Sequence, residues 1–261
     1  MIRTALITGS SSGIGLELAK IHASRGENLV LVARSADKLA ELKSELVRSY
    51  GTEVFIIARD LSEYGAAEDV YQETADHNIR IDYLINNAGF GDFGLFAESN
   101  WEKQEKMISL NVTALTHLTR LFLPGMIKRG AGRILNVAST AAFQPGPTMS
   151  VYFASKAYVL SFSEALNNEL KNSGITVTVL CPGSTDTPFH GVVLGDPALV
   201  KKRKMDDPVK VAEFGYKAMI TGKTVAIYGL KNTLMANAVR FLPRSFIVKM
   251  VRKIQEKKNA G

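Results

Sequence analysis

Residues 8–15 read TGSSSGIG, a glycine- and serine-rich turn with the spacing G-x-x-x-G-x-G. The apolar run at 4–7 predicts a buried strand before the turn, and the helical spacing of apolar residues at 16–21 predicts a helix after it. Strand, glycine turn and helix open a nucleotide-binding βαβ unit. Glycine lets the backbone approach a phosphate, and the helix start offers unpaired N–H groups and the positive end of its dipole. The stretch therefore predicts a site for the phosphates of a nucleotide.

The rest of the chain alternates short apolar runs with amphipathic stretches. Further strands are expected at 28–33, 54–57, 82–86, 133–138, 175–180 and 224–227. Further helices are expected at 36–50, 62–78 (with Ser62 as N-cap), 102–129, 151–173 and 208–221. This alternation is typical of a parallel sheet buried on both faces, so we expect a single-domain α/β fold of the Rossmann type, doubly wound, with about seven strands. Right-handed crossovers would bring the carboxyl ends of the strands to one edge, where the ligand crevice lies.

The domain boundaries follow from the same pattern. We expect a catalytic domain at 1–230, with an irregular substrate loop or lid at 183–206, and a basic helical extension at 231–261. The composition, 46% hydrophobic and 22% charged over 261 residues, is ordinary for a soluble domain. No leader pattern and no apolar run of about 18 residues is found, so we expect a cytoplasmic protein.

Cysteine and histidine usage excludes two kinds of site. Cys181 is the one cysteine, which excludes an internal disulfide, and its place after an apolar run predicts a core residue. The four histidines show no metal-ligand spacing, so no metal is predicted: His22, His77, His117 and His190.

The net charge of +7 is concentrated in the last third of the chain. No nucleic-acid-binding motif accompanies it, so an anionic cofactor or substrate explains the charge better than a nucleic acid. The stretch 244–254 interleaves apolar and basic residues. We favour a helix packed on the domain or on a neighbouring subunit, and a helix lying on a membrane surface is the alternative.

One constellation points to acid–base chemistry. Ser139 follows the expected strand at 133–138, and Tyr152 and Lys156, four residues apart, share one face of a helix. A neighbouring ammonium lowers the pKa of a phenol from near 10, and such a phenol can exchange a proton with a reacting oxygen. Ser139 can hydrogen-bond to the same oxygen. The three residues indicate a site that exchanges a proton with a reacting oxygen, and an ordinary contact between Tyr152 and Lys156 on the helix surface is the alternative.

Two charged residues follow the second and third strands. Arg34 stands where a dinucleotide fold meets the adenosine ribose, and a guanidinium there suits the 2′-phosphate of NADP. Asp60 is placed beside the adenine ring, where it can accept a hydrogen bond from the amino group, and a helix cap before Ser62 is a compatible alternative. A run of small and amide residues at 86–89, NNAG, allows close backbone approach to a ligand.

Together these motifs resemble the short-chain dehydrogenase/reductase family over about residues 1–190. The family's pattern is matched, in order and spacing, by Thr8-Gly9-x-x-x-Gly13-Ile14-Gly15, Asn86-Asn87-Ala88-Gly89, Asn111, Ser139, Tyr152-x-x-x-Lys156 and Pro182-Gly183. The resemblance implies that Tyr152 is the catalytic acid/base, that Lys156 lowers its pKa and binds the nicotinamide ribose, and that Ser139 orients the carbonyl. Asn111 would hold a water in a proton relay through Lys156.

The resemblance also implies a cofactor site. The residues expected to line it are Gly9, Ser11, Ser12, Gly13, Ile14, Gly15, Arg34, Asp60, Leu61, Asn87, Ala88, Gly89, Tyr152, Lys156, Pro182, Gly183, Thr185 and Thr187. NADP(H) is the expected cofactor and NAD(H) the alternative, because Arg34 resembles the NADP-preferring members whereas Ser10–Ser12 lacks the basic residue of their glycine loop.

The expected reaction is hydride transfer between a nicotinamide and a small-molecule carbonyl or alcohol. Aromatic residues predict an apolar pocket for a bulky or hydrophobic carbonyl, together with the loop at 190–206: Phe90, Phe93, Phe143, Phe153 and Phe189. The resemblance implies a homo-dimer or homo-tetramer formed through the helices at 102–129 and 151–173. A catalytically idle nucleotide sensor or membrane-surface scaffold is the rival interpretation, and the complete set of Asn111, Ser139, Tyr152 and Lys156 argues against it.

Overall fold

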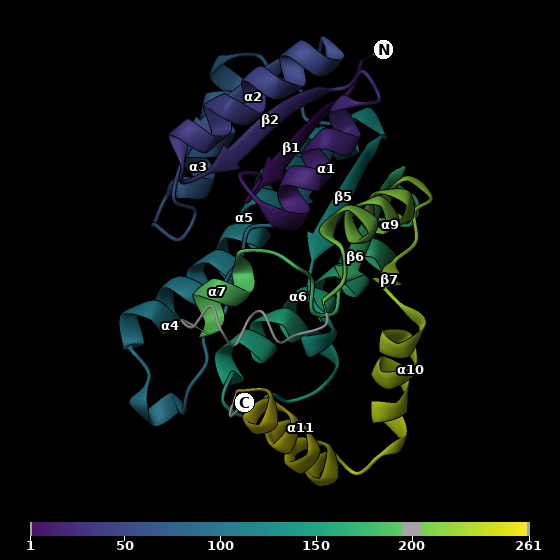
Figure 1. The fold of residues 1–261 in the computed structure, drawn as a ribbon. Coiled ribbons are helices and arrows are strands. Elements are labelled where there is room, and N and C mark those ends of the chain that lie inside the picture. Colours follow the sequence, from purple (N-terminus) through teal and green to yellow (C-terminus); the bar gives the residue numbers. More distant parts are fainter. Residues whose placement is uncertain (1, 195–204, 260–261) are drawn as a thin grey trace.

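The computed structural model describes residues 2–194 and 205–259. Its centre is one parallel sheet with the strand order β3-β2-β1-β4-β5-β6-β7 (Figure 1). The strands are β1 (Thr4–Thr8), β2 (Asn28–Ala33), β3 (Val54–Ala58), β4 (Tyr83–Asn86), β5 (Gly132–Val137), β6 (Ile175–Cys181) and β7 (Val225–Ile227). The order reverses between β1 and β4, which is the topological switch point of a doubly wound sheet. The expected Rossmann-type fold and each expected strand are confirmed.

Helices cover both faces of the sheet, and further helices lie beyond the carboxyl ends of its strands (Figure 1). They are α1 (Gly13–Ala23), α2 (Ala36–Tyr50), α3 (Ala66–Asp76), α4 (Trp101–Ile108), α5 (Leu115–Arg129), α6 (Ser150–Glu169), α7 (Phe189–Leu194), α9 (Pro208–Ile220), α10 (Leu230–Ala238) and α11 (Arg244–Asn259). Adjacent residues of a strand enter opposite layers: Ile7 packs with residues of α1, α2 and α9, and Leu6 packs with residues of α3, α5 and α6. Both side chains are fully buried, which is why the strands read as continuous apolar runs.

The helix expected at 102–129 contains a π-helical segment, Ser109–Ala114, between α4 and α5. A π-helical turn holds an extra residue and shifts the side chains that follow it, and such segments are frequent at functional sites. This segment carries Asn111, which is buried on the side that faces α6.

Two expected helix boundaries are wrong. The helix expected from Ser62 begins at Ala66, because the Asp60 carboxylate accepts the Ser62 N–H (2.9 Å) and hydroxyl (2.7 Å) and closes a turn there. The helix expected to reach residue 173 ends at Glu169. The chain then turns at Gly174, where φ is 76° and a Cβ would lie 2.0 Å from a neighbouring carbonyl oxygen.

The C-terminal segment forms α10 and α11, at the end of the molecule away from α2 and α3 (Figure 1). Ile247 and Val251 of α11 are buried in a cluster that contains Met107, Tyr152 and Phe153. The interpretation of this helix as one that packs on the domain agrees with these contacts. Among the residues that the structure describes, no helix has the length and apolarity required to cross a bilayer. The division at residue 230 stays a prediction.

Candidate active site

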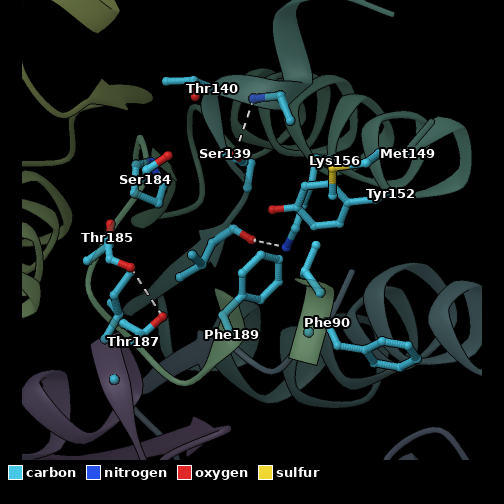
Figure 2. A pocket seen from close by; sticks show the side chains of 18 of the residues that line it. Phe90, Ser139, Thr140, Met149, Tyr152, Lys156, Ser184, Thr185, Thr187 and Phe189 are labelled. Atoms are coloured by element: carbon cyan, nitrogen blue, oxygen red, sulfur yellow. Dashed lines mark hydrogen bonds between the residues drawn. The ribbon is translucent and has the colours of Figure 1, made fainter. Parts of the chain in front are cut away.

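A cavity of about 1740 Å³ opens at the carboxyl ends of the strands. The turns that follow β1 to β6 all contribute to its lining, and α7, α10 and α11 close its far side. Figure 2 shows part of this space, where Ser139 after β5, Tyr152 and Lys156 of α6, and Phe189 of α7 surround one opening. The edge predicted from the topology is thus where the cavity lies.

The structure brings the expected cofactor residues together around this cavity. Its lining includes Gly9, Ser11, Ser12, Gly13, Ile14, Arg34, Asp60, Leu61, Asn87, Ala88, Gly89, Tyr152, Lys156, Pro182, Gly183, Thr185 and Thr187. Gly15 differs, because it packs behind the turn and does not line the cavity. A Cβ on Gly15 would lie 2.3 Å from the Gly9 carbonyl oxygen and 2.4 Å from Nδ2 of Asn87. The absence of a side chain at Gly15 therefore allows the glycine turn to pack closely against the start of α1.

The glycine turn is fixed by hydrogen bonds to the loop after β4. The Asn87 amide Nδ2 donates to the carbonyls of Thr8 (3.0 Å) and Gly9 (3.1 Å). In return, Thr8 Oγ1 accepts the N–H groups of Asn87 and Ala88, both at 3.0 Å. Gly9 and Gly13 have φ of 65° and 55°, which other residues rarely adopt. Because the Ser12 side chain makes no capping bond within the described chain, the N–H groups that begin α1 are left for an anion.

Ser139 and Tyr152 lie side by side in the lining of the cavity. Tyr152, in the first turn of α6, is 8% exposed, and its side chain neighbours that of Ser139. Ser139 Oγ accepts the N–H of Ala141 (3.1 Å), which fixes its rotamer. In Figure 2 the Tyr152 hydroxyl points into the space beside Ser139.

Lys156 is buried one helical turn below Tyr152. Its Nζ donates to the Val137 carbonyl (2.8 Å) and lies 5.9 Å from the centre of the Tyr152 ring. Burial lowers the pKa of Lys156 to about 8, so its amine is still mainly charged at pH 7. Burial also raises the pKa of Tyr152 to about 12, although the neighbouring Ser139 side chain acts to lower it. Lys156 is not among the causes of this shift, so the expected lowering of the Tyr152 pKa by Lys156 stays a prediction. With this pKa the phenol holds its proton at neutral pH.

Asn111 fixes the backbone beside this pair. Its Nδ2 donates to the Phe90 carbonyl (2.9 Å) and to Ser155 Oγ (3.1 Å), and its Oδ1 accepts the Phe90 N–H (3.1 Å). A Cβ on Gly89 would lie 2.9 Å from Asn111 Oδ1 and 3.3 Å from Lys156 Nζ, so glycine lets these two side chains approach. The Asn111 amide is thus engaged by protein, and the implied water relay stays a prediction.

Sequence reasoning missed two cations at the adenosine end. Lys38 and Arg59 line the cavity with Arg34. Although burial opposes it, the two hydrogen bonds from Ser62 and the Arg34 guanidinium, 3.7 Å away, hold the pKa of Asp60 below its usual value. The signal for Lys38 was its place one turn after the N-cap of α2, on the side of Arg34.

The largest element missed is the wall made by the C-terminal helices. It consists of Leu230, Met235, Leu242, Met250, Val251 and Ile254. Gly183 meets this wall, since a Cβ there would lie 2.6 Å from Nδ2 of Asn232 in α10. No motif in the sequence marks these residues as part of a site.

The predicted aromatic pocket is nearly complete. Phe90, Phe93, Phe153 and Phe189 line the cavity, and the rings of Tyr152 and Phe189 are 5.5 Å apart. Phe143 is wrong as a pocket residue: it packs against the cluster of Leu115 and Val159 instead. Residues 195–204 of the predicted loop lie outside the described part of the chain. The described segments on either side of these residues are joined by a hydrogen bond in which the Asp206 N–H donates to the Ser184 carbonyl (2.8 Å).

A doubly wound sheet with a glycine turn and a Ser-Tyr-Lys cluster at the switch-point edge defines a class of nucleotide-dependent oxidoreductases. The family model for short chain dehydrogenases matches residues 3–195. The chain therefore belongs to the short-chain dehydrogenase/reductase family, whose members bind NAD(P) and act on small molecules.

Relatives support the same assignment. A short-chain dehydrogenase from Sphingobium yanoikuyae in complex with NADPH is 35% identical, with a TM-score of 0.84 over 92% of each chain. The bulky-bulky ketone specific alcohol dehydrogenase from Comamonas testosteroni is 30% identical, with a TM-score of 0.79 over 92% of each chain. The very-long-chain 3-oxoacyl-CoA reductase of Rattus norvegicus is 33% identical over 251 residues, 91% of this chain and 77% of the relative.

Proposed function

We propose that this protein interconverts a ketone or aldehyde and an alcohol by hydride transfer with NADP(H), on a bulky or hydrophobic carbonyl substrate. The observation that carries the proposal is the buried Tyr152 side chain, whose hydroxyl points into the cavity beside Ser139, one helical turn from the charged Lys156. The apolar walls of the cavity support the substrate class, as does the specificity of the Comamonas relative for bulky-bulky ketones.

The residues present fit a dinucleotide. The backbone at Gly9 and Gly13 has positive φ, and the N–H groups at the start of α1 suit the pyrophosphate. Lys156 and residues of the loop 182–187 line the same cavity and would hold the nicotinamide riboside. When bound, the reduced nicotinamide would supply the hydride.

The protein's own residues would handle the proton. With its pKa raised to about 12, Tyr152 carries its proton at neutral pH and would donate it to the carbonyl oxygen. Ser139 would hydrogen-bond to that oxygen and hold it within reach of the phenol. The charged Lys156 would stabilise the phenolate that remains. In the reverse direction the phenolate would accept the proton of the alcohol.

The preference for NADP(H) rests on three cations. Arg34, Lys38 and Arg59 border the adenosine end of the cavity, and they supply positive charge that the serine-rich glycine turn lacks. The NADPH complex of the Sphingobium relative supports this choice. The Asp60 carboxylate is engaged by Arg34 (3.7 Å) and by the Ser62 N–H and hydroxyl.

Replacing the proton donor tests the reaction. We expect Tyr152→Phe to lower kcat by about 10³-fold, because loss of a general acid typically costs 10²–10⁴-fold. The control is Tyr158→Phe, on the same helix, whose half-exposed hydroxyl contacts Thr116 at 3.1 Å. NADPH oxidation with a set of ketones measures turnover, and NADPH fluorescence measures binding. Near-normal turnover by Tyr152→Phe would disprove the assignment, and NADPH binding without turnover of any carbonyl by the wild type would favour an idle sensor.

A pair of charge variants tests the cofactor preference. We expect Arg34→Ser with Lys38→Ser to raise the KM for NADPH at least about tenfold and to leave the KM for NADH unchanged, since the lost charge-assisted bonds serve only the 2′-phosphate. Arg48→Ser, at the far end of α2, is the control. Equal effects on both cofactors would refute the preference.

We also propose an assembly state and a cellular location for this protein, both on the basis of its family. We propose a cytoplasmic homo-dimer or homo-tetramer formed through the faces of α4 to α6, where Trp101, Ile108 and Tyr158 are exposed. Light scattering coupled to gel filtration would measure the assembly, and a monomer at micromolar concentration would contradict it.

A further inference from the structure

Large apolar side chains are exposed along the C-terminal segment. Leu234 of α10 is 72% exposed, Phe241 after α10 is 87% exposed, and Phe246 in the first turn of α11 is 53% exposed. None of these three lines the cavity, so their exposure is separate from the substrate site. On a folded domain, a series of exposed large apolar side chains marks a surface that contacts a partner.

The same segment is strongly basic. Between residues 230 and 256 the chain has one acidic residue, Glu256, and six cationic ones: Lys231, Arg240, Arg244, Lys249, Arg252 and Lys253. All six cationic residues are exposed. Arg252 bonds to Glu256 (2.8 Å), and the sequence continues with Lys257 and Lys258. Exposed apolar and exposed basic side chains therefore alternate along the same segment of the chain.

This surface is not needed to hold the segment on the domain. Ala236 of α10 and Ile247 and Val251 of α11 are buried, at 4–7% exposure, and they make the attachment. In Figure 1, α10 and α11 form the outer border of the molecule at the end opposite α2. The segment thus has one face fixed to the domain and another available to a partner.

We propose that this C-terminal surface, made by Leu234, Arg240, Phe241, Arg244, Phe246, Lys249 and Lys253, docks on the surface of an anionic lipid bilayer. Exposed aromatic and aliphatic side chains insert among the headgroups, while lysine and arginine side chains contact anionic lipid. Charge complementarity selects this partner over a second copy of the chain, because an isologous contact would bring the same cations against one another. The proposal stands independently of the reaction assigned above.

Vesicle flotation of the full chain tests the proposal. We expect binding to phosphatidylcholine vesicles that contain about a third phosphatidylserine, weak binding to pure phosphatidylcholine, and loss of binding as salt rises from about 0.1 M to 0.5 M. The variant Phe241→Ser with Phe246→Ser should bind at least about tenfold more weakly. Tyr64→Ser is the matched control, since Tyr64 is a fully exposed aromatic residue before α3. NADPH binding and the thermal midpoint, unchanged from wild type, show that the variants are folded.

A charge variant gives a second, independent arm. Arg244→Ser with Lys249→Ser should lose the preference for anionic vesicles while keeping its fold. Failure of the wild type to bind anionic vesicles would overturn the proposal, as would binding that neither pair of substitutions weakens. A concentration-dependent dimer that the phenylalanine variant dissociates would also overturn it, because the surface would then be a contact between copies.

Discussion

The two ends of the cavity are built on different principles. At the nucleotide end, backbone turns after β1 and β4 interlock through Thr8 and Asn87, and the glycines there leave no room for another atom. At the substrate end, the wall is made by helices that attach through a few apolar contacts such as Ile247 and Val251. The first end is built from the turns of the sheet itself, and the second from helices attached beyond it.

The largest difference in unfolding free energy is expected when a methyl group is added to one glycine at each end. In Gly15→Ala, the Cβ would lie 2.3 Å from a backbone oxygen, so we expect a loss of about 3 kcal/mol in unfolding free energy together with loss of NADPH binding. Gly191→Ala in α7 has no atom within 4 Å of its new Cβ, and we expect a change within about 0.5 kcal/mol. Urea unfolding measures both. Equal losses of unfolding free energy in the two variants would contradict the difference between the two ends of the cavity.

Acid should destabilise the contact between α1 and α9, at the edge of the sheet opposite the cavity. His22 of α1 is fully buried against Tyr216 of α9 (2.8 Å), and burial, with Arg25 nearby, lowers its pKa from 6.5 to about 4. Between pH 6.5 and about 4, the unfolded chain binds a proton at His22 and the folded protein does not. The free energy of unfolding therefore decreases as the pH falls. From pH 7 to 5 the wild type should lose about 2 kcal/mol more than His22→Gln. The exposed His77→Gln variant controls for loss of an imidazole, and parallel pH profiles for wild type and His22→Gln would contradict the expectation.

The smallest effect is expected at the substrate wall. Ile254→Ser removes an apolar side chain that lines the cavity, so the KM for a bulky ketone should rise about tenfold while that for a small ketone stays unchanged. Lys253→Ser, its exposed neighbour outside the cavity lining, is the control. Steady-state kinetics in lipid-free buffer measure both. A uniform change across substrates would show that α11 does not shape the pocket.

The same contrast explains what could be predicted from the sequence. The strands, the glycine turn and the Ser139, Tyr152 and Lys156 cluster follow from local patterns, because hydrophobic period, glycine spacing and helical spacing are properties of adjacent residues. Helix ends are predicted less well: a side-chain turn at Asp60 and a close backbone approach at Gly174 decide them.

The C-terminal wall and the burial of the proton donor could not be predicted. Ile254 and Met250 enter the cavity because α11 packs near α6, about a hundred residues earlier, and no local pattern encodes that contact. The pKa of Tyr152 depends on how completely the surrounding elements exclude water, which a four-residue spacing does not report.

Asn232 occupies the space that a side chain at Gly183 would need, and its amide also donates to the Tyr228 carbonyl (2.8 Å). Through this contact the position of α10 is coupled to that of the loop after β6, which lines the same cavity. A shift of α10 would therefore displace this loop, so we expect a substitution in α10 that reshapes the substrate wall to alter cofactor affinity as well.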